Sequence, residues 1–152
     1  MVKIVNGNLL DATEDVICHQ VNCQGVMNSG VAKAIRDKWP EVYFAYRAYT
    51  HSYTDENELL GKSFLVSLND SPQAVMNMFA QNLYGYDGSR YTSYDAFYKC
   101  LEDIKKKVSC HCSIAFPYKI GSDRGGASWD VIYAMICDVL GDWDVTIYKL
   151  ED

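Results

Sequence analysis

The sequence contains no long hydrophobic run, and none of its apolar segments approaches the roughly 18 residues that a membrane-spanning helix needs. Its first ten residues, MVKIVNGNLL, lack the charged head, the long apolar stretch and the small-residue cleavage site of a signal peptide. We therefore expect a protein that stays in the cytoplasm and has no contact with a membrane.

Positive charge is also scarce. Lys and Arg total 14 residues against 20 Asp and Glu, which gives a net charge of −6 and a pI of about 5.0. A protein that binds a nucleic-acid polymer usually presents a basic face that replaces counterions on the phosphates. The one basic cluster, Lys105–Lys107, ends an amphipathic helical pattern, where cations stabilise the helix C-terminus. We expect no direct binding to nucleic-acid polymers, and backbone amides must supply most contacts to any bound phosphate.

Six cysteines occur, at positions 18, 23, 100, 110, 112 and 137, and several lie within apolar strand or helix patterns. In a reducing compartment this placement favours buried free thiols over disulfides. The cluster Cys110-His111-Cys112 suggests a metal site, but on a strand His111 would point away from both cysteines. No CxxC pair supplies further ligands. We expect neither a metal site nor a cofactor.

The length of 152 residues and the hydrophobic content of 49% suit one folded domain with a real core. Apolar segments predict strands at residues 2–5, 16–21, 63–68, 74–80, 113–116 and 144–150. Asn69, Asp70, Ser71 and Pro72 predict a turn between the third and fourth of these strands.

Helical spacing predicts a helix from about residue 31, a second that starts at Pro40, and a third over residues 93–108. Ser128 can cap a fourth helix that Gly141 ends. The expected core face of that helix consists of Ile132, Met135, Ile136 and Val139. Because helices separate most of the strands, we expect a single α/β domain over residues 1–152, with a mostly parallel sheet.

Two strand-to-helix segments are rich in glycine and small polar residues: NCQGVMNSGV, residues 22–31, and IGSDRGGAS, residues 120–128. Ligands of such sheets bind at the carboxyl ends of strands, near helix N-termini. A glycine lets a phosphate approach the backbone closely, although glycine also serves ordinary turns. Two such loops in equivalent places favour an anion site, in which facing walls of amides surround a diphosphate.

Over nearly its full length the chain resembles the macrodomains, a family that binds ADP-ribose in a three-layer α/β/α sandwich with a mixed sheet. The similar segments are VNGNLLDA, ICHQVNCQGVMNSGVAKAIR, LLGKSFLV, VMNMFAQ, FPYKIG with GGASW, and TIYKL; the second and fifth are the specific ones. The chain looks most like the branch that contains ADP-ribose-1″-phosphate processing proteins and small ADP-ribosyl hydrolases. The resemblance implies ADP-ribose or a derivative as the ligand, and ADP-ribosylated macromolecules as further partners.

The resemblance also implies roles for single residues. Asn22 matches the asparagine that meets the distal ribose, where its amide can both donate and accept hydrogen bonds; a turn-forming Asn is the alternative. Asn8 replaces an aspartate that accepts from the adenine amino group, so we expect weaker binding of adenine. Tyr148 or Phe116 flanks the base, or else packs ordinarily. The expected ligand contacts are Asn8, Leu9, Asn22, Gly30, Val31, Ala32, Ile120, Gly121, Ser122, Asp123, Arg124, Gly125 and Tyr148.

The catalytic assignment departs from part of the family. One hydrolase type in the branch uses a lysine after the fourth strand and an aspartate in the second phosphate loop; here these positions hold Gln81 and a residue near Gly125. A lysine-dependent mechanism is therefore not expected. Phosphatase-like members carry a histidine at the position of His19, which, if it titrates near neutrality, can act as an acid or a base; a structural histidine bonded to loop backbone is the alternative. Asn22 and Asp123 complete the candidate catalytic set.

Two classes of function follow from the resemblance. The first is an enzyme that removes a phosphate, acyl or ADP-ribosyl group from the distal ribose. The second is a non-catalytic reader or scavenger of ADP-ribose or its derivatives. Asp87 and Arg90, in YGYDGSRY, either close over the site or belong to a plain exposed loop.

Overall fold

The computed structural model of the protein describes residues 1–69 and 73–150. Of the turn expected at residues 69–72, Asp70, Ser71 and Pro72 therefore lie outside the described residues.

Within the described residues, six strands form one sheet in the order β1-β6-β5-β2-β4-β3. The strands are β1 Val2–Asn6, β2 Val16–Val21, β3 Ser63–Ser67, β4 Ala74–Phe79, β5 Ile114–Pro117 and β6 Val145–Lys149. Neighbouring strands are parallel except for β3 and β4, which are antiparallel. The expectation of a mostly parallel mixed sheet is confirmed, and each predicted strand end lies within one residue of the observed end.

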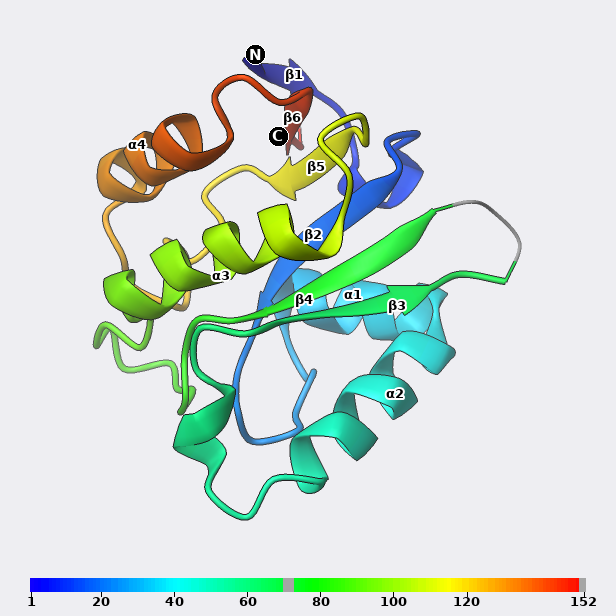
Figure 1. The fold of residues 1–152 in the computed structure, drawn as a ribbon. Helices are drawn as coiled ribbons and strands as arrows, with labels where there is room; N and C mark the ends of the chain where they lie inside the picture. The colour runs from blue at the N-terminus through cyan, green and yellow to red at the C-terminus, as the bar shows by residue number, and fades with distance from the viewer. Residues whose placement is uncertain (70–72, 151–152) are drawn as a thin grey trace.

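Four α-helices cover this sheet in the described part of the chain: α1 Gly30–Lys38, α2 Pro40–His51, α3 Tyr94–Lys107 and α4 Trp129–Leu140. Short 3₁₀ turns occur at Leu9–Asp11 and Glu56–Leu59. In Figure 1, α1 and α2 lie against one face of the sheet, and α3 and α4 lie against the other. The three-layer α/β/α sandwich is confirmed. Pro40 stands in the first turn of α2, where its missing N–H costs nothing, as predicted.

β2 and β4 lie in the middle of the sheet and are almost entirely buried. Strands covered by helices on both faces are mostly apolar in sequence, which is why both were predicted well although β2 contains His19 and Gln20 and β4 contains Asn77. Successive residues of β2 face opposite layers. Cys18 packs in the core on the side of α3 and α4, whereas Ile17 and Val21 pack toward α1 and α2. His19 shares this second face and is one of its few buried polar residues.

The ends of α3 and α4 differ in their capping. The Ser93 hydroxyl caps α3 by accepting a hydrogen bond from an N–H one turn later, at 3.1 Å. Ser128 stands at the N-cap position of α4, but its hydroxyl makes no capping bond, so the predicted side-chain cap is wrong. Its own N–H instead donates to the Tyr94 hydroxyl, at 2.8 Å. Gly141 ends α4 as predicted. On the core face of α4, Ile132, Ile136 and Val139 are buried and Met135 is partly buried.

All six cysteines are free thiols, and Cys18, Cys23 and Cys100 are buried. Cys110 and Cys112 lie with His111 in the turn between α3 and β5, so the assumption that they alternate along a strand is wrong. Among the described residues, no group of three or more His, Cys, Asp or Glu side chains is placed to hold a metal ion.

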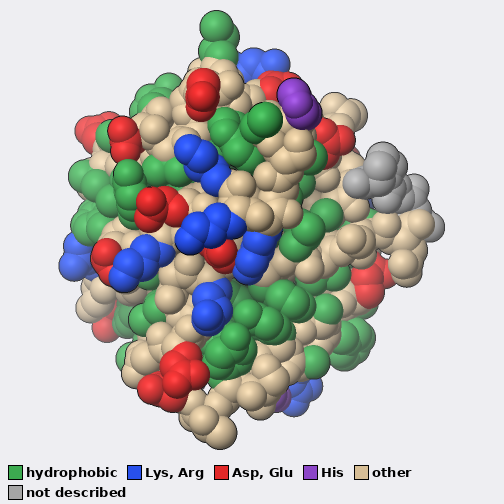
Figure 2. All heavy atoms as spheres, viewed as in Figure 1, with side chains coloured by type: hydrophobic (Ala, Val, Ile, Leu, Met, Phe, Trp, Pro, Cys, Tyr) green, Lys and Arg blue, Asp and Glu red, His purple; other side chains and the backbone are tan. Residues whose placement is uncertain are grey.

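The face of the molecule that includes α3 carries Lys and Arg side chains interleaved with Asp and Glu (Figure 2). Two ion pairs join successive turns of α3: Lys99 with Asp95 at 2.9 Å, and Lys107 with Asp103 at 2.8 Å. Two of the lysines of this helix are therefore compensated locally, and the acidic residues between the cations prevent a uniform basic surface. None of the helices in residues 1–69 and 73–150 is long and apolar enough to cross a membrane.

We predict that Phe97→Ala destabilises the protein by about 3 to 5 kcal/mol, because Phe97 is fully buried between α3 and the sheet and its loss leaves a cavity. The control is Phe44→Ala on α2, whose ring is 63% exposed. That variant should change the stability by less than about 0.5 kcal/mol. Urea unfolding measures both, and equal losses would show that α3 does not cover the sheet in this way.

Candidate functional site

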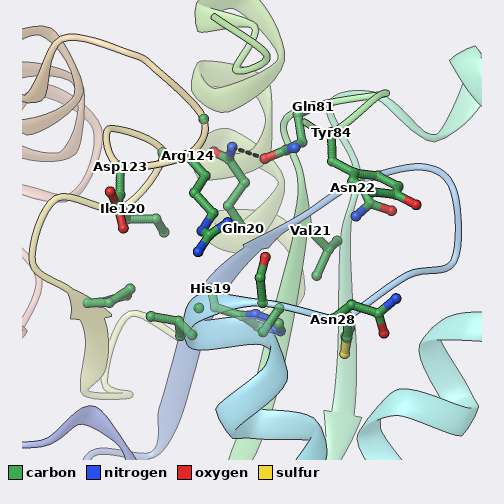
Figure 3. A pocket seen from close by; sticks show the side chains of 18 of the residues that line it. His19, Gln20, Val21, Asn22, Asn28, Gln81, Tyr84, Ile120, Asp123 and Arg124 are labelled. Atoms are coloured by element: carbon green, nitrogen blue, oxygen red, sulfur yellow. Dashed lines mark hydrogen bonds between the residues drawn. The ribbon is translucent and has the colours of Figure 1, made fainter. Parts of the chain in front are cut away.

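Three loops meet at the carboxyl ends of β2, β4 and β5, which run parallel to one another. The first loop comprises residues 22–29 after β2, and the second loop comprises residues 118–128 after β5. The third loop comprises residues 80–92 after β4. The first cavity, of about 190 Å³, lies between them, with His19 at its floor (Figure 3). The two loops that the sequence singled out therefore face one space, and residues of the third loop close its side.

Most of the expected site residues line this first cavity. They are His19, Asn22, Gly30, Val31, Ala32, Ile120, Gly121, Asp123, Arg124 and Gly125. Ser122, also expected, is not among the lining residues; its N–H donates to the Lys119 carbonyl at 2.9 Å within the turn. Lys119 has a φ of 62°, which is uncommon outside glycine, and it lines the cavity although no local pattern distinguishes it.

A second cavity, of about 640 Å³, adjoins the first around the start of α1. Asn8, Leu9 and Tyr148, the remaining expected ligand contacts, line its far end. Residues common to both cavities are Gly30, Val31, Pro117, Tyr118, Lys119 and Asp123. Small-molecule sites typically occupy several hundred cubic ångströms, so together the cavities can hold an extended ligand.

Asn22 leaves the end of β2, and the loop itself holds its side chain. Its Oδ1 accepts from the Gln24 N–H at 3.0 Å and from the Tyr46 hydroxyl at 2.9 Å. Its Nδ2 donates one hydrogen to the Val26 carbonyl at 2.8 Å, and the amide has a second hydrogen to offer. The loop and Tyr46 of α2 thus engage the oxygen, and what the Asn22 side chain can offer to a ligand is a donor. Sequence reasoning missed Tyr46, which nothing local distinguishes among 12 tyrosines.

The first loop ends at Gly30, whose φ of +60° favours glycine. A Cβ added at Gly30 would meet nothing within 4 Å, because this residue faces the open cavity. The first N–H groups of α1 have no acceptors within the helix, and the Ser29 side chain at the N-cap position makes no capping bond. The amides at the start of α1 therefore face a space that suits an anion.

Glycines of the second loop allow it to pack against the loop of residues 84–92. A Cβ on Gly125 would lie 2.3 Å from the Thr92 hydroxyl, and a Cβ on Gly126 would lie 2.7 Å from backbone of the same loop. The N–H groups of Tyr91 and Thr92 both donate to the Gly125 carbonyl, at 2.8 and 3.0 Å. Two of the glycines are thus required by a contact between loops, which is a different reason from the close approach of a ligand.

An uncharged hydrogen-bond network includes Gln81, the residue that the resemblance aligns with the lysine of lysine-dependent hydrolases. The Gln20 amide nitrogen donates to the Gln81 side-chain oxygen at 2.7 Å (Figure 3) and to the Thr92 hydroxyl at 2.8 Å. Thr92 in turn donates to the Gly121 carbonyl at 2.8 Å. This network connects β2, the loop after β4 and the second loop. Neither Gln20 nor Thr92 is distinguished by a local sequence pattern, and neither was among the expected site residues.

His19 is 1% exposed, and its Nε2 lies 2.6 Å from the side-chain oxygen of Asn77 on β4. Burial lowers the pKa of His19 to about 4, and the hydrogen bond with Asn77 opposes that shift. The ring is therefore neutral at physiological pH, and the expectation that His19 titrates near neutrality is wrong. The alternative, a structural histidine bonded to loop backbone, is also not what is observed. The partner of His19 is the side chain of Asn77 on the neighbouring strand β4.

Asp123 is the more accessible ionisable candidate. It is exposed, and it lines both cavities close to the start of α1. An exposed carboxylate in this place can exchange protons with water or with a ligand.

At the far end of the second cavity, the Asn8 side-chain oxygen accepts from the Leu10 N–H at 3.0 Å. The Tyr148 hydroxyl donates to Glu14 at 2.5 Å, which orients the ring beside the cavity. Burial, followed by the contact with Glu14, raises the pKa of Tyr148 to about 12. Phe116 is fully buried in the core on the side of α3 and α4, so the suggestion that it flanks a base is wrong.

The loop after β4 contributes Tyr84 and Tyr86 to the first cavity. The Arg124 guanidinium lies over the Tyr86 ring, 4.2 Å from its centroid, and so joins this loop to the second loop. Asp87 and Arg90 are exposed and are not among the residues that line either cavity. The plain exposed loop is thus the better description of these two residues.

Comparison with known proteins gives one family and several relatives. A family model described as "Macro domain" matches residues 18–136. The chain is 27% identical to a DNA ADP-ribosyl glycohydrolase of Mycobacterium tuberculosis over 97% of this chain and 42% of that protein. It is 33% identical to an ADP-ribose 1″-phosphate phosphatase of Aspergillus oryzae over 39% of this chain and 30% of that protein. The structure of Thermosipho africanus DarTG in complex with ADP-ribose superposes with a TM-score of 0.79 at 21% identity, covering 97% of this chain and 41% of that one. The chain thus spans less than half the length of the glycohydrolase relative.

We predict that His19 makes the stability depend on pH between about 6.5 and 4. The folded pKa of about 4 lies below the ordinary value of 6.5, so the unfolded chain binds more protons between these values. The contribution of His19 is then complete above pH 6.5 and decreases as the pH falls toward 4, by a total of the order of 3 kcal/mol.

Urea unfolding between pH 7.5 and 4.5 tests this for the wild type, for His19→Gln and for His111→Gln, which replaces an exposed histidine. The loss of stability on acidification should be smaller in His19→Gln and unchanged in His111→Gln. Identical pH profiles for all three proteins would contradict the burial of a neutral His19.

Proposed function

The chain belongs to the macrodomain family, and we propose that it binds ADP-ribose or a derivative in the two adjoining cavities and hydrolyses a group at the distal ribose. The observation that carries the proposal is the position of the start of α1. Its amides lie between the Asn22 end of the first cavity and the Tyr148 end of the second.

The order of the lining groups suits the order of groups in ADP-ribose. Asn8 and Tyr148 offer a polar and an aromatic side chain for the adenine end. The amides of α1 and of the Gly121 loop suit the diphosphate in the middle. Asn22 offers an amide donor to the distal ribose. In a chain with a net charge of −6, amides are a better source of anion affinity than basic side chains.

The names of two relatives concern the distal end of ADP-ribose. One relative is named for ADP-ribosyl groups on DNA, and another for the 1″-phosphate of ADP-ribose. We propose ADP-ribosylated macromolecules or ADP-ribose-1″-phosphate as substrates of this chain. A modified polymer would be recognised through its ADP-ribosyl group and not through a basic face, given the charge of the chain. A cytoplasmic location and a single domain over residues 1–152 stay predictions.

Within this proposal, Asp123 is the acid or base, because it is the exposed carboxylate that both cavities share. Asn22 positions the distal ribose through its amide hydrogen. Gln81 stands where related hydrolases use a lysine, so the reaction does not proceed through a charged residue there. That same uncharged network favours the second candidate function, a reader of ADP-ribose that performs no chemistry.

We predict that Gly30→Glu abolishes binding of ADP-ribose, because its carboxylate would enter the space that faces the amides of α1 and repel the diphosphate. Gly88→Glu is the matched control: Gly88 also has a positive φ, of 81°, and open space around it, but it lies outside both cavities. In the wild type and the control, ADP-ribose at about 100 times its Kd should add about 2.7 kcal/mol of stability. AMP should add less, because it lacks the distal ribose and one phosphate.

Calorimetry and thermal melts measure the binding. Normal affinity in a folded Gly30→Glu protein would show that the first loop is only a turn. If saturating ADP-ribose gave neither heat nor a shift of Tm in the wild type, the proposed ligand would be wrong.

We predict that Asp123→Asn lowers turnover by about 10² to 10⁴ while affinity for ADP-ribose changes little, as expected for loss of a general acid or base. Asn22→Ala should weaken binding itself by about 1 to 3 kcal/mol. Asp142→Asn removes an exposed carboxylate that lines neither cavity and should change neither turnover nor affinity. The assay is product analysis with ADP-ribose-1″-phosphate, ADP-ribosylated DNA and ADP-ribosylated protein. A wild type that binds ADP-ribose but converts none of the three supports the reader and excludes the enzyme for these substrates.

A further inference from the structure

His19 and Asn77 lie side by side on β2 and β4, the adjacent strands in the middle of the sheet. They are register partners in the parallel pair β2 and β4, and they are 1% and 0% exposed. The contact of 2.6 Å joins His19 Nε2 to Asn77 Oδ1. A pair of polar side chains in an otherwise apolar layer is costly to bury unless its hydrogen bonds are made.

The orientation of the Asn77 amide follows from its other contact. Asn77 Nδ2 lies 3.1 Å from the backbone carbonyl of Phe64, its partner on β3. A carbonyl can only accept, so the amide nitrogen must face Phe64 and the amide oxygen must face His19. The reversed amide would bring two oxygens together and lose the bond to β3.

The orientation of Asn77 in turn determines the tautomer of His19. An amide oxygen accepts, so Nε2 must be the nitrogen that has the proton. Burial lowers the pKa of the ring to about 4, so a second proton is absent at neutral pH. Nδ1 is then an unprotonated acceptor.

Nδ1 has no hydrogen-bond partner in the part of the chain that the structure describes, and it is buried. Buried polar atoms are nearly always paired. His19 nevertheless lines the first cavity, at its floor beneath Gln20 and Val21 (Figure 3). Nδ1 itself has almost no accessible surface, so a donor in the cavity reaches it only when the residues around the ring shift.

We propose that Asn77 is a positioning residue that holds His19 in the tautomer protonated at Nε2, which leaves Nδ1 as the acceptor for a hydroxyl donor of the first cavity once the residues around the ring shift to admit it. The donor chemistry is a hydroxyl of the distal ribose or a water molecule. The identity of the donor rests on the proposed function, whereas the tautomer does not. His19 then recognises or orients the reacting end and does not protonate a leaving group.

The decisive measurement is ¹⁵N NMR of the histidine ring at neutral pH in the ligand-free wild type. The spectrum should show His19 with a pyrrole-type Nε2 and a pyridine-type Nδ1. A protonated Nδ1 or a doubly protonated ring would overturn the proposal, even if ADP-ribose binds normally. Because this measurement needs no ligand, it stands if the proposed function fails.

Two variants test the role of Asn77. Asn77→Leu removes the acceptor, so His19 should populate both tautomers and ADP-ribose affinity should fall by between about twofold and tenfold. Asn77→Asp keeps an oxygen facing Nε2 and should keep the tautomer, although its charge should raise the pKa of His19. Thr146→Val, a near-isosteric change at another buried polar residue of the sheet, is the control and should leave the ring signals of His19 unchanged. A pure Nε2–H tautomer in a folded Asn77→Leu protein would show that Asn77 does not position His19.

Addition of ADP-ribose to the wild type distinguishes the donors. A shift of the Nδ1 resonance on binding, absent with AMP, assigns the donor to the distal ribose. A Nδ1 that is already hydrogen-bonded without ligand and does not change on binding assigns it to water. A Nδ1 that shows no hydrogen bond in either state would overturn the acceptor role.

Discussion

Parallel pairing of β2 with β4 on one side and with β5 on the other is the constraint on which the rest of the structure depends. Because the three strands run in one direction, their carboxyl ends coincide and their following loops must share one edge of the sheet. A strand in that central place needs cover on both faces, which α1 and α2 provide on one side and α3 and α4 on the other. His19 is neutral because the helices bury it against the sheet. Asp123 is exposed because it lies in a loop beyond the ends of the covered strands.

The parts of the fold that were predicted correctly are those that short stretches of sequence encode. Mostly apolar segments predicted the ends of β2 and β4, and Pro40 and Gly141 marked a helix start and a helix end by their own chemistry. The two glycine-rich loops were recognised by composition, and both line the first cavity. Composition could not show that Gly125 is small because a second loop packs on it. It also could not show that the Ser128 hydroxyl leaves its helix uncapped.

Contacts between residues far apart in the sequence could not be predicted. The hydrogen bond of Tyr46 to Asn22 joins residues 24 positions apart, that of Gln20 to Thr92 joins residues 72 apart, and that of His19 to Asn77 joins residues 58 apart. Strand register and helix placement bring these partners together, and a local sequence pattern predicts neither of them. The pKa of His19 was misjudged for the same reason, since desolvation depends on what packs over a strand and not on its neighbours in sequence.

The N–H groups of Tyr91 and Thr92 share the carbonyl of Gly125. Loops joined in this way do not open singly, because moving residues 119–127 outward breaks both bonds or takes residues 84–92 along. A ligand held between the two loops would be released with a joint movement of both loops. The residence time of such a ligand would depend on the free energy of opening the two loops as well as on the contacts of the ligand. A substitution that loosens either loop would shorten that residence time.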